Sequence, residues 1–76
     1  MNKERRNRIN KVIEQLETLK DEISDISMEE SEAYDNLPEG IQDSDRGEAM
    51  QEAIDNLDMA SDTFDDIIEY LNEATQ

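Results

Sequence analysis

The chain contains no cysteine and no histidine, and it has only two glycines and one proline. Without cysteine it can form neither a disulfide bond nor a reactive thiolate. Without histidine it lacks the residue most often used for acid–base catalysis and for metal binding. The two glycines form no phosphate-binding loop motif. We therefore expect that the protein is not an enzyme and that it holds neither a cofactor nor a metal ion.

Long hydrophobic runs are also missing. No apolar stretch approaches the roughly 20 residues of a membrane-spanning helix, and the N-terminus lacks the apolar core of a signal peptide. The sequence thus predicts a cytoplasmic protein without a membrane partner. Its 76 residues, of which 34% are hydrophobic, allow one domain with a thin core. A domain of this size usually needs an ion, a covalent cross-link or a partner subunit to fold stably.

Positive charge is scarce and unevenly placed. Seven basic residues stand against 22 acidic ones, which gives a net charge of −15. Residues 1–11 carry +4 and residues 12–46 carry −10, while residues 47–76 carry nine acids and no base. Nucleic acids and anionic membranes repel such a chain, so we expect no direct nucleic-acid binding. The expected partner is a basic protein surface, and many such surfaces belong to nucleic-acid-binding proteins.

The apolar residues follow a heptad pattern in both halves of the chain. They recur in alternating steps of three and four, which is typical of helices that pack through heptad positions a and d. In the C-terminal half, position a holds Met50, Leu57, Phe64 and Leu71, and position d holds Ala53, Ala60, Ile67 and Ala74. In the N-terminal half, position a holds Ile9, Leu16, Ile23, Glu30 and Leu37, and position d holds Val12, Leu19, Ile26 and Ala33. Glu30 is the polar exception; either the core frays there or the residue specifies the register.

These patterns predict one all-α domain over residues 1–76, an antiparallel, coiled-coil-like two-helix hairpin. The first helix is expected over about 3–35, the connector over 36–43 and the second helix over about 45–75. Seating the connector at its midpoint pairs residues whose numbers sum to about 83. Under that register every a residue faces a d residue, and Leu16, for example, meets Ile67.

The connector carries several local signals. Pro38 cannot continue a helix, and Gly40 is free to adopt a positive φ, so residues 38–40 are expected to form a turn. Ser44 is a good N-cap for the second helix. Gly47 in its first turn permits close packing.

A second uncharged strip runs beside the heptad core at positions e and g. Its members are Ile13, Tyr34, Ile54, Ile68 and Tyr70. Either these residues widen the core of a monomeric hairpin, or they form a contact surface. We predict the second: a dimerisation or docking strip, through which two copies form a homodimeric four-helix bundle.

The acids of the second helix occupy positions b, c and f and predict a partner-binding face. Its residues are Glu52, Asp55, Asp58, Asp62, Asp65, Asp66 and Glu69. The second helix carries one acid per roughly 5 Å of helix axis, and a DNA strand carries one phosphate per roughly 3.4 Å. The face therefore either imitates nucleic acid or serves only solubility. A metal-binding role is disfavoured because no loop has calcium-binding spacing.

The basic N-terminus has two possible uses. It could contact nucleic acid or lipid headgroups, or it could form ion pairs within the hairpin. We expect the second, with Arg5, Arg6, Arg8 and Lys11 lying beside the acids at the end of the second helix. Those acids are Asp65, Asp66, Glu69 and Glu73.

The connector Asp35-Asn36-Leu37-Pro38-Glu39, together with residues 32–34, 40–42, 44–48 and 52–57, resembles a group of short acidic proteins encoded by phages and mobile elements of Gram-positive bacteria. The resemblance extends from residue 1 to about 72. The group has no assigned function, so the resemblance transfers no site residues. It implies a phage context, in which strongly acidic proteins often block host nucleic-acid-binding defence or repair enzymes. The sequence-based hypothesis is such an inhibitor in the host cytoplasm, a DNA mimic; the alternative is a homodimeric structural or regulatory interaction module.

Overall fold

The computed structural model describes all 76 residues and contains three helices, α1 (Lys3–Asp35), α2 (Glu39–Gln42) and α3 (Asp45–Ala74). α1 begins after Asn2, whose side-chain Oδ1 accepts a hydrogen bond from the backbone N–H of Arg5 at 2.8 Å. This bond satisfies one of the amides that a helix leaves free in its first turn. α3 begins after Ser44, which occupies the expected N-cap position with an extended backbone; its side chain makes no capping hydrogen bond, and its hydroxyl donates to the carbonyl of Ile41 instead.

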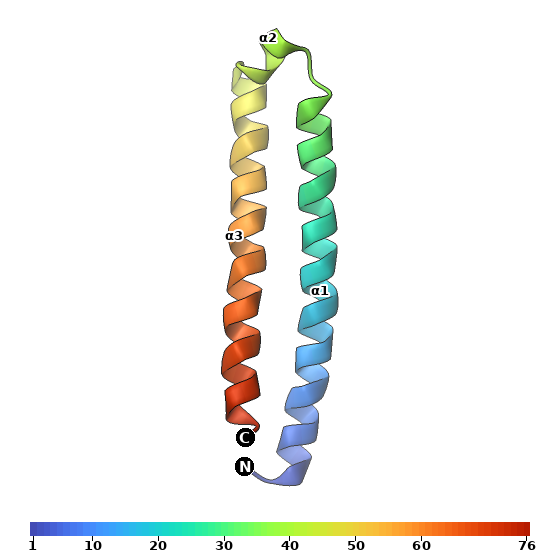
Figure 1. Cartoon of the computed structure of the whole chain (residues 1–76), viewed down its shortest axis with the longest axis vertical. Coiled ribbons are helices and arrows are strands. Elements are labelled where there is room, and N and C mark those ends of the chain that lie inside the picture. The colour runs from blue at the N-terminus through green and yellow to red at the C-terminus, as the bar shows by residue number, and fades with distance from the viewer.

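α1 and α3 lie side by side in opposite directions and are joined at one end by the connector that contains α2 (Figure 1). The result is a rod with principal extents of 58, 15 and 12 Å. Both chain termini lie at the end opposite the connector. The predicted all-α antiparallel hairpin is thus confirmed. The same arrangement leaves only one layer of side chains between the two helices.

The connector differs from the expected turn. Residues 39–42 form the single helical turn α2, in which the carbonyl of Pro38 accepts bonds from the amides of Ile41 and Gln42 at 2.8 and 3.1 Å. No residue of the chain has a positive φ, so the conformation expected for Gly40 is wrong. Every residue of a right-handed helical turn has a negative φ, so Gly40 needs no positive φ inside α2. Pro38 lies directly before this turn, where its fixed negative φ is tolerated.

Two contacts attach the connector to the long helices. The side-chain amide of Gln42 donates a hydrogen bond to the carbonyl of Tyr34 at 3.1 Å, which connects α2 to the last turn of α1. Gly47 is buried, and a Cβ atom placed on it would lie 2.0 Å from the backbone oxygen of Gln42. The close packing expected at Gly47 is therefore present, because α2 lies directly against the first turn of α3 at this residue.

The interface between α1 and α3 uses the predicted a row but not the predicted d row. Most of the a residues are half-buried, as expected. The second row of the interface lies at position e instead, and Ile13 in this row is the only hydrophobic residue exposed by less than a tenth. The larger d residues remain exposed: Val12 by 43%, Leu19 by 48%, Ile26 by 45% and Ile67 by 41%.

Polar contacts between the helices accompany this shift. Lys20 binds Asp65, Ser24 binds Ser61 and Ser27 binds Asp58, and in each pair the residue numbers sum to 85. The register that placed Leu16 opposite Ile67 is therefore wrong by two residues. The serines that face each other are small and can hydrogen-bond, so they allow the e and b positions to meet across the middle of the rod.

Candidate functional site

The hairpin has two long sides of different chemistry. Both helices turn their a and e positions inward, and antiparallel helices that share inward positions also share their lateral ones. The b and f positions of α1 and α3 therefore fall on one side of the rod, and the d and g positions on the other. Position c lies on the outer edge of each helix.

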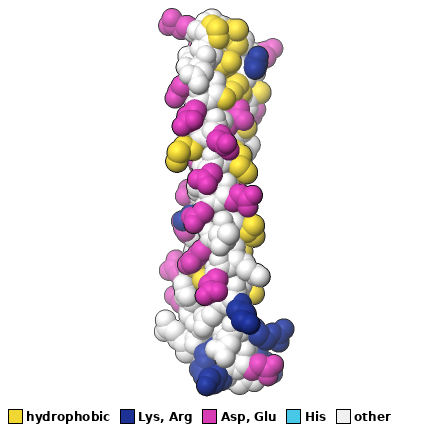
Figure 2. Space-filling model, turned by 90° about the vertical axis from the view of Figure 1, so that its right-hand side faces the viewer, with side chains coloured by type: hydrophobic (Ala, Val, Ile, Leu, Met, Phe, Trp, Pro, Cys, Tyr) yellow, Lys and Arg dark blue, Asp and Glu magenta, His cyan; other side chains and the backbone are white.

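The side formed by positions b and f is called the acidic side here. A shallow depression shows how the two helices share it, because α1 contributes Ser31, Tyr34 and Asp35 and α3 contributes Gln51, Ile54 and Asp55. The acidic side carries Glu14, Glu17, Asp21 and Asp35 from α1, and Glu48, Asp55, Asp58, Asp62, Asp65 and Glu69 from α3. All ten of these carboxylates are exposed. Figure 2 shows acidic side chains along most of the rod.

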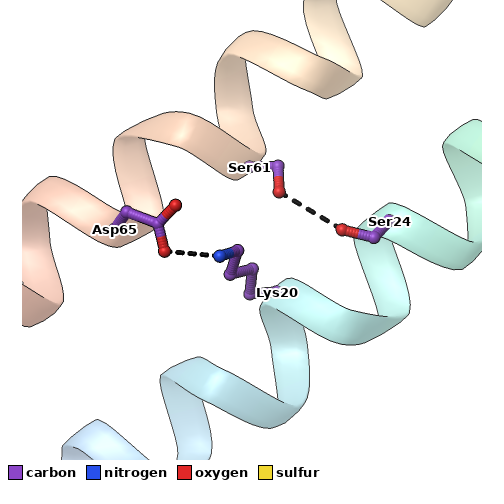
Figure 3. A network of polar contacts seen from close by, with 4 residues as sticks. All are labelled: Lys20, Ser24, Ser61 and Asp65. Atoms are coloured by element: carbon purple, nitrogen blue, oxygen red, sulfur yellow. Dashed lines mark hydrogen bonds and ion pairs between the residues drawn. The ribbon is translucent and has the colours of Figure 1, made fainter.

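The structure places all seven predicted partner-binding acids in solvent. Five of them lie on the acidic side, and Glu52 and Asp66 lie at position c on the outer edge of α3. Two of the five also have partners within the chain. Asp58 accepts a hydrogen bond from the Ser27 hydroxyl at 2.8 Å, and Asp65 pairs with Lys20 (Figure 3).

The Lys20–Asp65 pair has an electrostatic consequence for the lysine. The pKa of Lys20 is raised above its ordinary value of 10.5, first by the hydrogen bond to Asp65 and then by the negative charge of nearby acids. Removal from water acts in the opposite direction. The side chain of Lys20 is 30% exposed and that of Asp65 is 57% exposed, so water screens this pair.

The side formed by positions d and g is called the apolar side here. It carries Val12, Leu19, Ile26 and Ala33 from α1, and Ala53, Ala60, Ile67, Ala74 and Tyr70 from α3. Its only acids are Glu22 and Glu29, at position g of α1. Figure 2 looks at the outer surface of α1 and shows hydrophobic side chains along its right-hand edge, beside the acids.

The predicted dimerisation or docking strip does not form a single exposed surface. Ile13 is 8% exposed, and Tyr34, Ile54 and Ile68 are half-buried between the helices. These four residues widen the core of the hairpin, which is the alternative that the sequence left open. Only Tyr70, at 73% exposure, lies outside the core, on the apolar side. Sequence spacing alone did not distinguish position d from position e, because apolar residues occupy both.

The basic residues form a separate tip at the N-terminal end of α1, visible as the dark blue cluster in Figure 2. This basic tip consists of Lys3, Arg5, Arg6, Arg8 and Lys11. None of these residues forms an ion pair, because Lys20–Asp65 is the only salt bridge of the chain. The expected pairing with Asp66, Glu69 and Glu73 is therefore absent. With a register sum of 85, residue 76 lies beside residue 9, so the first turns of α1 extend past the end of α3.

No group of three or more carboxylates is arranged so that it could hold a metal ion. None of the helices has the combination of length and hydropathy that a bilayer crossing requires. The surface has three depressions, and none is an enclosed cavity.

Comparisons with protein-family models, with curated proteins and with solved structures gave no match. Functional inference therefore rests on the two sides and the basic tip of the hairpin itself.

Proposed function

We propose that this protein binds a basic surface of a nucleic-acid-binding protein through its acidic side, and that it inhibits that protein by occupying the place of nucleic acid. The observation that supports the proposal most is the position of the acids. Ten carboxylates from two helices share one side of a rod 58 Å long, and the only base that approaches them is Lys20.

The spacing of these charges suits a nucleic-acid-binding groove. The ten carboxylates occupy about 35 Å of the rod at 1.5 Å per residue, which corresponds to one negative charge per about 3.5 Å, against one per roughly 3.4 Å along a DNA strand. The edge acids Glu52, Asp66 and Glu73 raise the density further. A basic groove sums many modest charge contacts, so affinity should be distributed over the acidic side and should fall steeply with salt.

The biological setting proposed for this activity is a phage or mobile element, with a host defence or repair enzyme as the target in the host cytoplasm. This part of the proposal rests on the resemblance of the connector and its flanking residues. The acidic side supports only the chemistry of the partner, which is a basic surface that binds the phosphate groups of nucleic acid.

A matched pair of triple variants tests the role of the acidic side. The first variant neutralises three f positions without intrachain partners, Asp55→Asn, Asp62→Asn and Glu69→Gln. The control neutralises three acids away from this side, Glu22→Gln, Asp25→Asn and Glu29→Gln. Both changes move the net charge from −15 to −12, so only the position of the lost charges differs.

The assay is capture of proteins from a bacterial lysate on the immobilised chain, followed by competition with duplex DNA. The proposal predicts that captured proteins are released by DNA and by raising salt from about 0.05 to about 0.5 M. It also predicts that the acidic-side variant loses capture while the control variant keeps it. If the captured protein holds DNA and this chain at the same time, the mimicry proposal is wrong.

A second candidate function is a homodimeric interaction module whose charge serves only solubility. The exposed residues Leu19, Ile26 and Ile67 on the apolar side favour it, since an uncharged row is unusual in so acidic a chain. Under this function the acidic-side variant should self-associate like the parent, whereas the control, which neutralises Glu22 and Glu29 on the apolar side, should change self-association.

A further inference from the structure

The apolar side of the hairpin has no covering element, although it is built like half of a protein core. Four large side chains, Val12, Leu19, Ile26 and Ile67, are between 41% and 48% exposed there. Alanines fill the remaining d positions, at residues 33, 53, 60 and 74. A helix that is apolar at positions a, d and e has enough apolar surface to pack against two neighbouring helices. In the hairpin each long helix packs against only one other long helix.

We infer that a second copy of this chain covers the apolar side, with the two hairpins running in opposite directions to form a four-helix bundle. This inference goes beyond the proposed function, because the acidic side of each copy stays exposed whether or not the copies associate. It also replaces the strip of e and g residues that the sequence suggested for dimerisation.

The dimensions of the apolar side suit a stable dimer. The whole side of the rod, 58 Å long and 15 Å wide, has a projected area on the order of 900 Å² per copy, and the d rows from Val12 to Ala33 and from Ala53 to Ala74 occupy about 32 Å of its length. Stable protein–protein interfaces bury about 800 Å² on each partner. The single apolar layer inside the hairpin, where only Ile13 is nearly fully buried, leaves the monomer with a thin core that such an interface would complete.

The order of side chains on the apolar side favours opposite directions. The row of α1 reads Val12, Leu19, Ile26, Ala33, and its midpoint lies between Leu19 and Ile26. When a second copy is reversed about this midpoint, Leu19 meets Ile26 of the second copy and Val12 meets Ala33. On α3 the same reversal brings Ile67 against Ala60. Large residues meet in the centre and small residues accept larger ones elsewhere, which suits close packing.

Charge complementarity favours the same orientation. The basic tip, residues 1–11, has a net charge of +4, and the connector end, residues 32–48, has −5, with its one base, Arg46, at position d on the apolar side. Arg5, Arg8 and Val12 line one surface depression, so two arginines of the tip lie on the same side as the apolar row. In the antiparallel dimer the tip of each copy lies against the connector end of the other. A parallel dimer would instead bring tip against tip and connector end against connector end.

Sedimentation equilibrium and a matched pair of variants test the association. Leu19→Glu places a charge on the apolar side, whereas Met28→Glu places the same charge on the acidic side of the same helix. Both residues are exposed in the hairpin, by 48% and 61%. We expect the parent and Met28→Glu to sediment as dimers at micromolar concentration. We expect Leu19→Glu to raise the dissociation constant on the order of 100-fold.

The parent chain supplies a test that does not depend on a variant folding. The melting temperature of a dimer rises with protein concentration, because dissociation accompanies unfolding. A parent that sediments at 8.8 kDa and melts at the same temperature at every concentration would overturn the inference. Equal dissociation constants for Leu19→Glu and Met28→Glu would overturn the proposed surface.

Orientation is measured by spin labels. The chain has no cysteine, so Asn7→Cys provides one label site near the tip on the acidic side. At 1.5 Å per residue the antiparallel dimer separates the two labels by about 45 Å, and a parallel dimer brings them to within about 25 Å. Arg5→Glu with Arg8→Glu should weaken an antiparallel dimer. A short label distance, or a stronger dimer after this charge reversal, would refute the antiparallel arrangement.

Discussion

Lys20 on α1 and Asp65 on α3 form the single ion pair of the protein, with 2.5 Å between Nζ and Oδ1. The pair lies next to the bond between Ser24 and Ser61, whose hydroxyl oxygens are 3.2 Å apart (Figure 3). Together these contacts define the register of the two helices in the middle of the rod.

The Lys20–Asp65 pair should make stability depend on pH at the alkaline end. The pKa of Lys20 is raised by folding, so its contribution is fully present below the ordinary value of 10.5 and is lost as pH rises through the folded pKa. We expect the stability difference between the parent and Lys20→Met to be constant near neutral pH and to shrink above pH 10.5. Urea unfolding across this range measures it. Lys11→Met, which removes a lysine that forms no ion pair, is the matched control.

Gly47 should be intolerant of a side chain. A Cβ atom there would lie 2.0 Å from the backbone oxygen of Gln42, which cannot move without displacing α2. We expect Gly47→Ala to destabilise the fold by about 1–3 kcal/mol in spite of its better helix propensity. Gly40→Ala is the matched control, because nothing lies within 4 Å of that position. It should be neutral or stabilising by up to about 1 kcal/mol. Equal melting temperatures for the two variants would contradict the packing of α2 on α3.

Ile13 should contribute more to stability than any exposed apolar residue. It is 8% exposed in the hairpin, whereas Met28 on the same helix is 61% exposed. Ile13→Ala should cost about 2 kcal/mol or more, because it removes buried methyl groups and leaves a cavity. Met28→Ala should change stability by less than about 0.5 kcal/mol. Chemical unfolding of both variants, monitored by circular dichroism, gives the comparison. A larger loss in Met28→Ala would mean that position e is not the core row.

The serine pair should be coupled in a double-mutant cycle. Each single change, Ser24→Ala or Ser61→Ala, leaves a partly buried hydroxyl without its partner and should cost up to about 1 kcal/mol. The double variant loses both hydroxyls and gains two strong helix formers, so it should be at least as stable as the parent. Stabilities that simply add would show that the two hydroxyls do not interact.

The heptad spacing was sufficient to predict the helices and their antiparallel pairing, because position a is apolar in both halves except at Glu30 and Pro38 interrupts the pattern once. It was not sufficient to predict the second row of the interface. Val12 and Ile13 are adjacent and equally apolar, and periodicity alone cannot decide which of them turns inward. The decision depends on contacts between distant residues, such as Ser27 with Asp58, that no local pattern records.

The heptad pattern was likewise sufficient to predict only some features of the candidate surfaces. Exposure of the acids on α3 followed from their heptad positions, because carboxylates without basic partners stay in water. The absence of ion pairs at the basic tip did not follow, since it depends on a two-residue change in register and on the length by which α1 exceeds α3. The apolar side was hidden for the same reason: its residues were expected to fill the core.

The contacts of α1 with α2 and α3 span very different lengths of chain. Gln42 and Tyr34 are 8 residues apart, Ser27 and Asp58 are 31 apart, and Lys20 and Asp65 are 45 apart. Because the entropy lost on closing a loop increases with its length, each contact is easier to form once the one nearer the connector exists. The hairpin therefore has a preferred order of assembly, from the connector towards the termini. Opening proceeds in reverse, so the ends of α1 and α3 that lie near the chain termini separate first and the connector opens last.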